Sequence, residues 1–321
     1  MKNILKYTLF TAVAIGFVLA GSSCSKEETL DENTKIHGLG GDEYTETPID
    51  KWLYESFVKQ YNIEVKYRFN QFELDLNKTL VPIKEDIVTP VMEIVKRVWI
   101  DPYDKLAGST FVKNLAPKKF VLVGSPQYNN GTITLGEAEG GRKIVIFRLN
   151  WFNTKAVTAE EIATQKDLIQ SIMKTVHHEF VHTMHQTIMY PEEFMNITPA
   201  GYTSSWNNVK DIDALKLGYI SPYACSNSNE DFAETISRIL VYGKAAFDKR
   251  VADATAIYKD PKQNEGMTYD PGIALRKKES MIITYLKDVW NVDLYDPAPG
   301  VKGLETLVQE AINASLPTTN N

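Results

Sequence analysis

The chain of 321 residues has little cysteine, little histidine and no excess of positive charge. With only two cysteines, Cys24 and Cys225, it cannot build a disulfide framework. A net charge of −6 without a basic cluster argues against nucleic acid as a partner. After residue 21, no apolar stretch is long enough to cross a membrane. The five histidines leave few positions for a metal site built on imidazole groups.

The N-terminus has the features of an export signal and is set aside before the fold is considered. Lys2 and Lys6 precede an apolar run over residues 9–21, which is too short for a comfortable membrane span. The run ends at Gly21-Ser22-Ser23-Cys24, which resembles the lipobox of bacterial lipoproteins, although Gly21 stands where an aliphatic residue is usual. This resemblance implies a lipoprotein signal peptide over residues 1–24, with a lipid anchor on Cys24.

The segment after Cys24 is acidic and poor in large apolar residues. Its start, Ser25-Lys26-Glu27-Glu28, resembles the tag that directs lipoproteins of the Bacteroidetes to the outer face of the outer membrane. Residues 25–47 are therefore predicted to form a flexible acidic tether, and the protein is expected at the cell surface. The remaining residues, 48–321, are long enough for one large domain.

Apolar periodicity and turn residues predict an α+β fold for this body. The expected strands are those over residues 63–69, 120–123, 132–135 and 143–149. The Asn130-Gly131 and Gly140-Gly141 turns favour an antiparallel meander of the last three strands. The expected helices lie over residues 50–60, 86–98 (ending at Asp101-Pro102), 230–247, 272–290 and 303–313. This order predicts an antiparallel sheet lobe, then an active-site helix, then a helical C-terminal lobe, with a cleft between the lobes.

The most informative stretch is the H-E-x-x-H pattern His178-Glu179-Phe180-Val181-His182. Residues four apart share one face of a helix, so both imidazoles can bind one Zn²⁺ while Glu179 acts as the general base. Thr158-Ala159-Glu160-Glu161 is typical of a capping box at the start of this helix, and Pro191 is expected to close it after Tyr190. Two ordinary histidines on a helix are the alternative interpretation.

A catalytic zinc usually has a third protein ligand and one open position for water. The metzincin pattern does not provide it, because His185 and Ile188 stand where its glycine and third histidine belong. Glu230 and Glu234, however, are four residues apart and share one face of the next expected helix. One carboxylate can bind the metal while the other orients a ligand histidine; a solvated acidic helix start is the alternative.

The arrangement Asn229-Glu230-Asp231-Phe232-Ala233-Glu234 resembles the glutamate-zincin, or gluzincin, pattern. The resemblance implies that Glu230 is the third zinc ligand and that Glu234 holds His178 or His182 from behind. Tyr223, seven residues before Glu230, resembles the tyrosine that stabilises the oxyanion in some gluzincins. A core tyrosine is the other interpretation of Tyr223, since the chain has 16 tyrosines.

Three further residues near these motifs carry open interpretations. His185 lies seven residues after His178 on the same expected helix face, where it lines the cleft, packs in the core, supplies a proton donor or stands behind the metal ligands. His177 points roughly a quarter-turn away and is interpreted as structural. Cys225 is interpreted as a small buried residue, with a metal role as the alternative.

Several segments together resemble one family, the substrate import-associated zinc metallohydrolase lipoproteins, which belong to the Bacteroidetes putative zinc-binding metallopeptidases. They are the lipoprotein start, the H-E-F-V-H and N-E-D-F-A-E helices, Val121-Leu122-Val123-Gly124-Ser125-Pro126 and Gly140-Gly141-Arg142-Lys143-Ile144-Val145. The resemblance covers nearly the whole mature chain. It implies a zincin-like fold, a zinc cofactor and a place beside an outer-membrane nutrient importer.

Two functions follow from these patterns. The first is a zinc metallopeptidase that cleaves a peptide, protein or glycopeptide, with the strand over residues 143–149 offering a free edge to an extended substrate. The second is a non-catalytic binding accessory of a nutrient importer, in which Trp151, Tyr202 and Trp206 stack on sugar rings. Glu179 discriminates between them, because a binding protein has no need of an unligated carboxylate between two metal-binding histidines.

Overall fold

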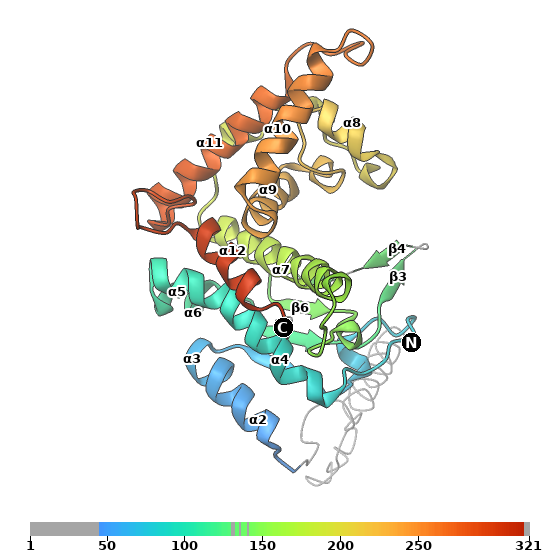
Figure 1. Cartoon of the computed structure of the whole chain (residues 1–321), viewed down its shortest axis with the longest axis vertical. Coiled ribbons are helices and arrows are strands. Elements are labelled where there is room, and N and C mark those ends of the chain that lie inside the picture. Colours follow the sequence, from blue (N-terminus) through green and yellow to red (C-terminus); the bar gives the residue numbers. More distant parts are fainter. Residues whose placement is uncertain (1–44, 130–131, 135, 140, 318–321) are drawn as a thin grey trace, which may run out of the picture. The chain divides into compact units, whose positions relative to one another are not determined.

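A computed structural model (Figure 1) describes residues 45–317, apart from residues 130, 131, 135 and 140. Its first helical run comprises α2 (Pro48–Leu53), a π-helical turn (Tyr54–Val58) and α3 (Lys59–Tyr61). The run begins with a capping box between Thr47 and Asp50. It ends at Asn62, whose φ of 56° is left-handed. The helix predicted over residues 50–60 is therefore confirmed.

The second helical run is longer than predicted. It passes from α4 (Glu85–Val95) through a π-helical turn (Lys96–Ile100) into α5 (Asp101–Ala107), and α6 (Ser109–Leu115) follows. The prediction that Asp101-Pro102 stops this helix was wrong. At the π turn the N–H of Asp101 bonds to the carbonyl of Lys96, five residues earlier. The regular α-helical hydrogen bonding is therefore already interrupted just before Pro102, which has no N–H to donate.

The sheet has four short strands in the order β1 (Glu64–Lys66), β2 (Lys119–Leu122), β6 (Lys143–Ile146) and β5 (Gly136–Glu139). β1, β2 and β6 are parallel, and only β5 is antiparallel to its neighbour β6. The predicted antiparallel meander was therefore wrong. The hairpin of β3 (Gln127–Asn129) and β4 (Thr132–Thr134) stands apart as a second sheet, which lets β6 return beside β2 in the same direction.

The long helix α7 (Ala159–Thr187) follows β6 after a 3-10 turn at Leu149–Trp151. The predicted capping box is present, since Thr158 accepts from the Glu161 N–H and the Glu161 carboxylate accepts from the Thr158 N–H. The helix ends at Thr187, three residues earlier than expected. None of the helices in the described part of the chain is both long and apolar enough to cross a membrane.

The C-terminal part is helical, as predicted. Its helices are α8 (Asp211–Lys216), α9 (Ser228–Tyr242), α10 (Lys244–Lys259), α11 (Pro271–Trp290) and α12 (Leu304–Ala314). The helix expected over residues 230–247 is in fact two helices. Gly243, with a φ of 88°, separates α9 from α10, and side chains rarely tolerate that conformation. Short 3-10 turns occupy the connection between α7 and α9, at Glu192–Phe194, Pro199–Gly201, Trp206–Asn208 and Tyr223–Cys225.

One main hydrophobic core joins the sheet side to the C-terminal helices, with buried side chains from α4, α7, α9, α11 and α12. A smaller cluster of Val121, Val123, Val145 and Phe147 covers the other face of β2 and β6. Figure 1 shows α7 between the strands and α9, and α7 contacts β5, β6, α9 and α12. The helix that carries the H-E-x-x-H pattern is thus fixed by neighbours on several sides.

Candidate metal centre

The packing of α7 against α9 brings together the two predicted histidine ligands and Glu230. His178 and His182 are one turn apart on α7, and Glu230 lies in the first turn of α9. The Glu230 Oε2 atom is 2.9 Å from the His178 Nε2 atom and 3.2 Å from the His182 Nε2 atom. The two Nε2 atoms are 3.0 Å apart. Three atoms with lone pairs therefore converge on one point.

This donor set fits a zinc ion. Two imidazole nitrogens and one carboxylate oxygen are typical ligands of a catalytic zinc, which keeps its fourth position open. With metal–ligand bonds of about 2.0–2.2 Å, a tetrahedral ion separates its ligands by roughly 3.3–3.5 Å, slightly more than the separations found here. A small outward movement of the three side chains is therefore enough to admit the ion.

The electrostatics of the cluster favour a cation. Burial opposes a charge on His178, but the hydrogen bond to Glu230 and the negative charge of Glu234 outweigh this effect and raise the pKa of the imidazole to about 9. Burial also opposes the Glu230 carboxylate, yet the hydrogen bonds from His178 and His182 hold its pKa well below the usual value. Without metal, a proton on His178 supplies positive charge at the point where the three ligands meet.

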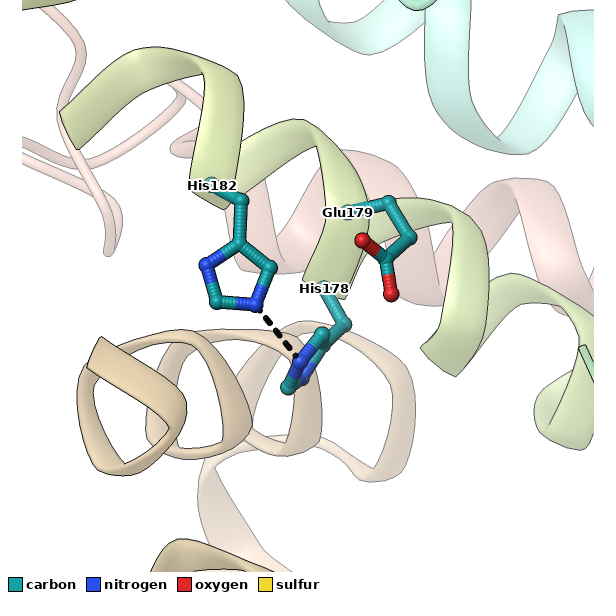
Figure 2. Close-up of side chains that lie close together, drawn as sticks. All are labelled: His178, Glu179 and His182. Carbon is teal, nitrogen blue, oxygen red and sulfur yellow. Dashed lines mark hydrogen bonds between the residues drawn. The ribbon is translucent and has the colours of Figure 1, made fainter. Parts of the chain in front are cut away.

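Glu179 lies beside this cluster. One oxygen of its carboxylate and one nitrogen of each histidine lie within 4.8 Å of one another. Figure 2 shows the imidazoles of His178 and His182 facing each other, with the Glu179 carboxylate to one side of the pair. Burial raises the pKa of Glu179 above its usual value, which strengthens this carboxylate as a proton acceptor.

The Glu234 carboxylate is fully buried behind His178. Its Oε1 atom lies 3.4 Å from the His178 Nδ1 atom and accepts a hydrogen bond of 2.7 Å from Lys174. Its Oε2 atom accepts hydrogen bonds of 2.7 Å from Ser221 and 2.8 Å from Arg238. Of the two predicted alternatives, His178 and His182, Glu234 thus faces His178. Among the described residues, the His178 Nδ1 atom has no formed hydrogen bond.

His185 lies behind the other ligand, with its Nε2 atom 2.8 Å from the His182 Nδ1 atom. Burial and the neighbouring His182 lower the pKa of His185 to about 4, so its imidazole is neutral at physiological pH and can accept a hydrogen bond. The sequence interpretation offered a cleft wall, a core residue, a proton donor or a place behind the metal ligands. The contact makes His185 the hydrogen-bond partner of His182, through the ring nitrogen that faces away from Glu230, in agreement with its predicted place behind the metal ligands.

Tyr223 also lies at the site. Its ring stacks on the His178 imidazole, with 5.6 Å between ring centroids and an angle of 29°. Trp206 packs edge-on against Tyr223, with 4.8 Å between the ring centroids. Burial, followed by the negative charge of Glu230, raises the pKa of the Tyr223 hydroxyl, which therefore stays protonated and able to donate.

The three aromatic residues proposed to stack on sugars make different contacts. The Tyr202 hydroxyl donates to the buried Asp231, and the Tyr202 ring packs on Tyr219. Trp151 is about half exposed and carries the Arg148 guanidinium 4.6 Å from its ring centroid. Trp206 packs on Tyr223, next to the metal ligands.

The remaining predicted residues are peripheral to the site or lie outside the described part. His177 and Cys225 are both fully buried. The ring of His177 lies 5.9 Å from that of Tyr103, on the side of α7 that faces α5. Burial lowers the pKa of His177 to about 3, and its neutral ring suits a structural role. Cys24 lies outside the described residues.

Four charged residues around the site were missed by the sequence interpretation. Lys174 and Arg238 had a detectable signal, because Lys174 lies four residues before His178 and Arg238 four residues after Glu234. The other two form a fully buried ion pair, in which Lys278 Nζ lies 2.6 Å from Asp231 Oδ2. This pair links α11 to α9 next to Glu230, and nothing in the local sequence marks Lys278 as buried.

A helix with two facing histidines, a carboxylate that approaches both of them and a partly buried glutamate beside them is the arrangement of a zinc site of the metallohydrolase class. A family model described as "Putative zinc-binding metallo-peptidase" matches residues 42–295. The chain belongs to this family, and zinc is its cofactor. It is also similar to the crystal structure of a putative zinc-binding metallo-peptidase from Bacteroides caccae ATCC 43185, with 30% identity and a TM-score of 0.65. That match covers 83% of this chain and 92% of the other. A search of curated proteins found no match.

Proposed function

We propose that the chain is a zinc-dependent peptidase that hydrolyses peptide bonds with Glu179 as the general base. The position of Glu179 carries this proposal. Its carboxylate is partly buried, lies beside His178 and His182, and is not needed as a ligand, since Glu230 approaches both histidines more closely. A structural zinc site would have no use for a further carboxylate with a raised pKa that is not a ligand.

The residues around the ligands fit the steps of peptide hydrolysis. Zinc bound by His178, His182 and Glu230 supplies a Lewis acid that lowers the pKa of water towards about 7. Glu179 accepts the proton of the attacking water and passes it to the leaving amine. The Tyr223 hydroxyl, kept protonated by burial, donates a hydrogen bond to the oxyanion that develops on the scissile carbonyl.

A peptide substrate has a strand edge near this site, although not the predicted one. β6 pairs with β2 on one side and β5 on the other, so the strand over residues 143–149 has no free edge. Within the described strands, β5 pairs only with β6, so its outer edge can add a peptide strand. The turn between β5 and β6 packs closely on α7 at Thr183, the residue after His182. A Cβ atom added to Gly141 in this turn would lie only 2.9 Å from the Thr183 side chain.

We further propose that the enzyme is a cell-surface lipoprotein anchored through Cys24, serving an outer-membrane nutrient importer. The apolar run, the small residues before Cys24 and Lys26-Glu27-Glu28 support this proposal. In Cys24→Ala the protein should leave the membrane fraction. Replacing Lys26-Glu27-Glu28 by alanines should leave the lipoprotein facing the periplasm, where protease added to intact cells does not reach it. If that protease degrades this variant as fast as the wild type, surface sorting by these residues is contradicted.

The proposed activity is tested with a peptide-library digest by the purified, zinc-loaded protein, with Glu179→Gln as the matched variant. The wild type should cleave peptide bonds, and the cleavage products define the side-chain preference. Glu179→Gln should retain zinc while its activity falls by roughly 10²- to 10⁴-fold. A Glu179→Gln protein that binds zinc and cleaves at the wild-type rate would exclude this mechanism.

A further inference from the structure

The two histidine ligands are held from behind in different ways. The His182 Nδ1 atom is 2.8 Å from a neutral imidazole, that of His185, which is an ordinary hydrogen-bond distance. The His178 Nδ1 atom instead lies 3.4 Å from the Glu234 Oε1 atom, and among the described residues it forms no hydrogen bond. A carboxylate is a stronger hydrogen-bond acceptor than a neutral imidazole, yet the Glu234 carboxylate lies farther from its histidine than His185 lies from His182.

The neighbours of Glu234 explain this distance. Its Oε2 atom is fixed by two donors, the Ser221 hydroxyl at 2.7 Å and the Arg238 guanidinium at 2.8 Å. The orientation of the carboxylate is therefore restricted. Its Oε1 atom faces two nitrogen atoms. It lies 2.7 Å from the Lys174 ammonium and 3.4 Å from the His178 Nδ1 atom. Lys174 thus binds the same oxygen that faces the His178 Nδ1 atom.

We propose that Lys174 is a positioning residue that acts on zinc through Glu234. By binding Oε1, Lys174 weakens the hold of Glu234 on His178 and keeps the zinc affinity below what this ligand set would otherwise reach. The inference rests on His178 being a zinc ligand, as the proposed function also requires. The inference goes beyond that function in one respect: Lys174, the cation bound to the Glu234 carboxylate, determines how strongly Glu234 fixes His178.

A simpler role for Lys174 is to neutralise the buried charge of Glu234. Arg238 is the control for that role, because it carries the same charge, lies on the same carboxylate and binds the other oxygen. Both side chains are partly exposed, at 21% for Lys174 and 34% for Arg238, so either can be replaced without opening a cavity in the core. If charge alone matters, Lys174→Met and Arg238→Met should change zinc affinity equally.

The experiment compares the zinc affinities of the full-length wild type, Lys174→Met, Lys174→Arg and Arg238→Met, by competition with a chromophoric chelator. Partners behind a metal ligand are typically worth 10- to 100-fold in affinity, so Lys174→Met should bind zinc about tenfold more tightly than the wild type. Arg238→Met should change the affinity by no more than about threefold, and Lys174→Arg, which keeps a donor on Oε1, by no more than about twofold.

Equal affinities of Lys174→Met and Arg238→Met, or weaker binding by Lys174→Met, would overturn the proposal. Thermal unfolding of the metal-free proteins shows whether each variant folds. If Lys174→Met does not fold, Lys174→Gln replaces it, since it removes the charge but keeps a weaker donor; it should shift the affinity in the same direction by a smaller factor. The zinc content of the wild type distinguishes failure of this proposal from failure of the proposed function. A wild type that binds no zinc would refute the proposed function itself.

Discussion

The contact between His182 and His185 leads to a prediction about zinc affinity. In His185→Phe the ring keeps its place against Tyr190 and Phe232, whose ring centroids lie 5.7 and 6.4 Å from that of His185. The substitution removes both ring nitrogens, including the acceptor that lies 2.8 Å from the His182 Nδ1 atom. Loss of such a partner typically costs about 10- to 100-fold in metal affinity, or roughly 1.4–2.8 kcal/mol.

The assay is competition for zinc against a chromophoric chelator at neutral pH, where His185 is neutral. His185→Gln is the control, because its amide oxygen can accept the same hydrogen bond and should recover part of the affinity. Thermal unfolding of the metal-free protein shows whether the phenyl ring is accommodated. A folded His185→Phe protein that binds zinc within about twofold of the wild type would refute the reasoning and leave His185 a packing residue.

Two further predictions concern stability and protonation. Lys278→Met should cost about 3–5 kcal/mol in the free energy of unfolding measured with urea, because it leaves Asp231 buried without its ion pair; adding Asp231→Asn should recover most of the loss. A cost below about 1 kcal/mol would show that Asp231 finds another partner. Zinc binding at pH 7.5 should release about one proton, because His178, with a pKa of about 9 in the metal-free protein, must lose its proton to bind the metal. Affinity should thus rise with pH up to about 9; binding heats that are equal in buffers of different ionisation enthalpy would contradict this.

The metal-binding helix was predictable from the sequence because its signals are local. A capping box, apolar spacing and the H-E-x-x-H pattern all act within one helix, and the structure has α7 beginning where they indicate. The placement of Glu230 beside both histidines depended on resemblance to a known pattern, because sequence spacing does not say which helices pack together. The contact of Lys174 with Glu234 depends on the same packing of α7 on α9, whereas Arg238 binds Glu234 within α9.

The direction of the strands was predicted wrongly because turn residues were given more weight than composition. Asn130-Gly131 does join an antiparallel hairpin, but that hairpin lies outside the main sheet. The near-continuous apolar runs 120–123 and 144–147 are typical of parallel strands covered on both faces, which is how β2 and β6 are buried. In this sequence the apolar runs, and not the turn residues, indicate the strand direction.

The central claim is one zinc held by His178, His182 and Glu230, and elemental analysis of the metal-replete protein tests it most directly. The wild type should contain about one zinc per chain, and His182→Ala and Glu230→Ala should lose most of it while remaining folded. Glu234→Ala should weaken zinc binding less than Glu230→Ala, since only Glu230 lies between the two Nε2 atoms. Full zinc retention in His182→Ala would contradict the account.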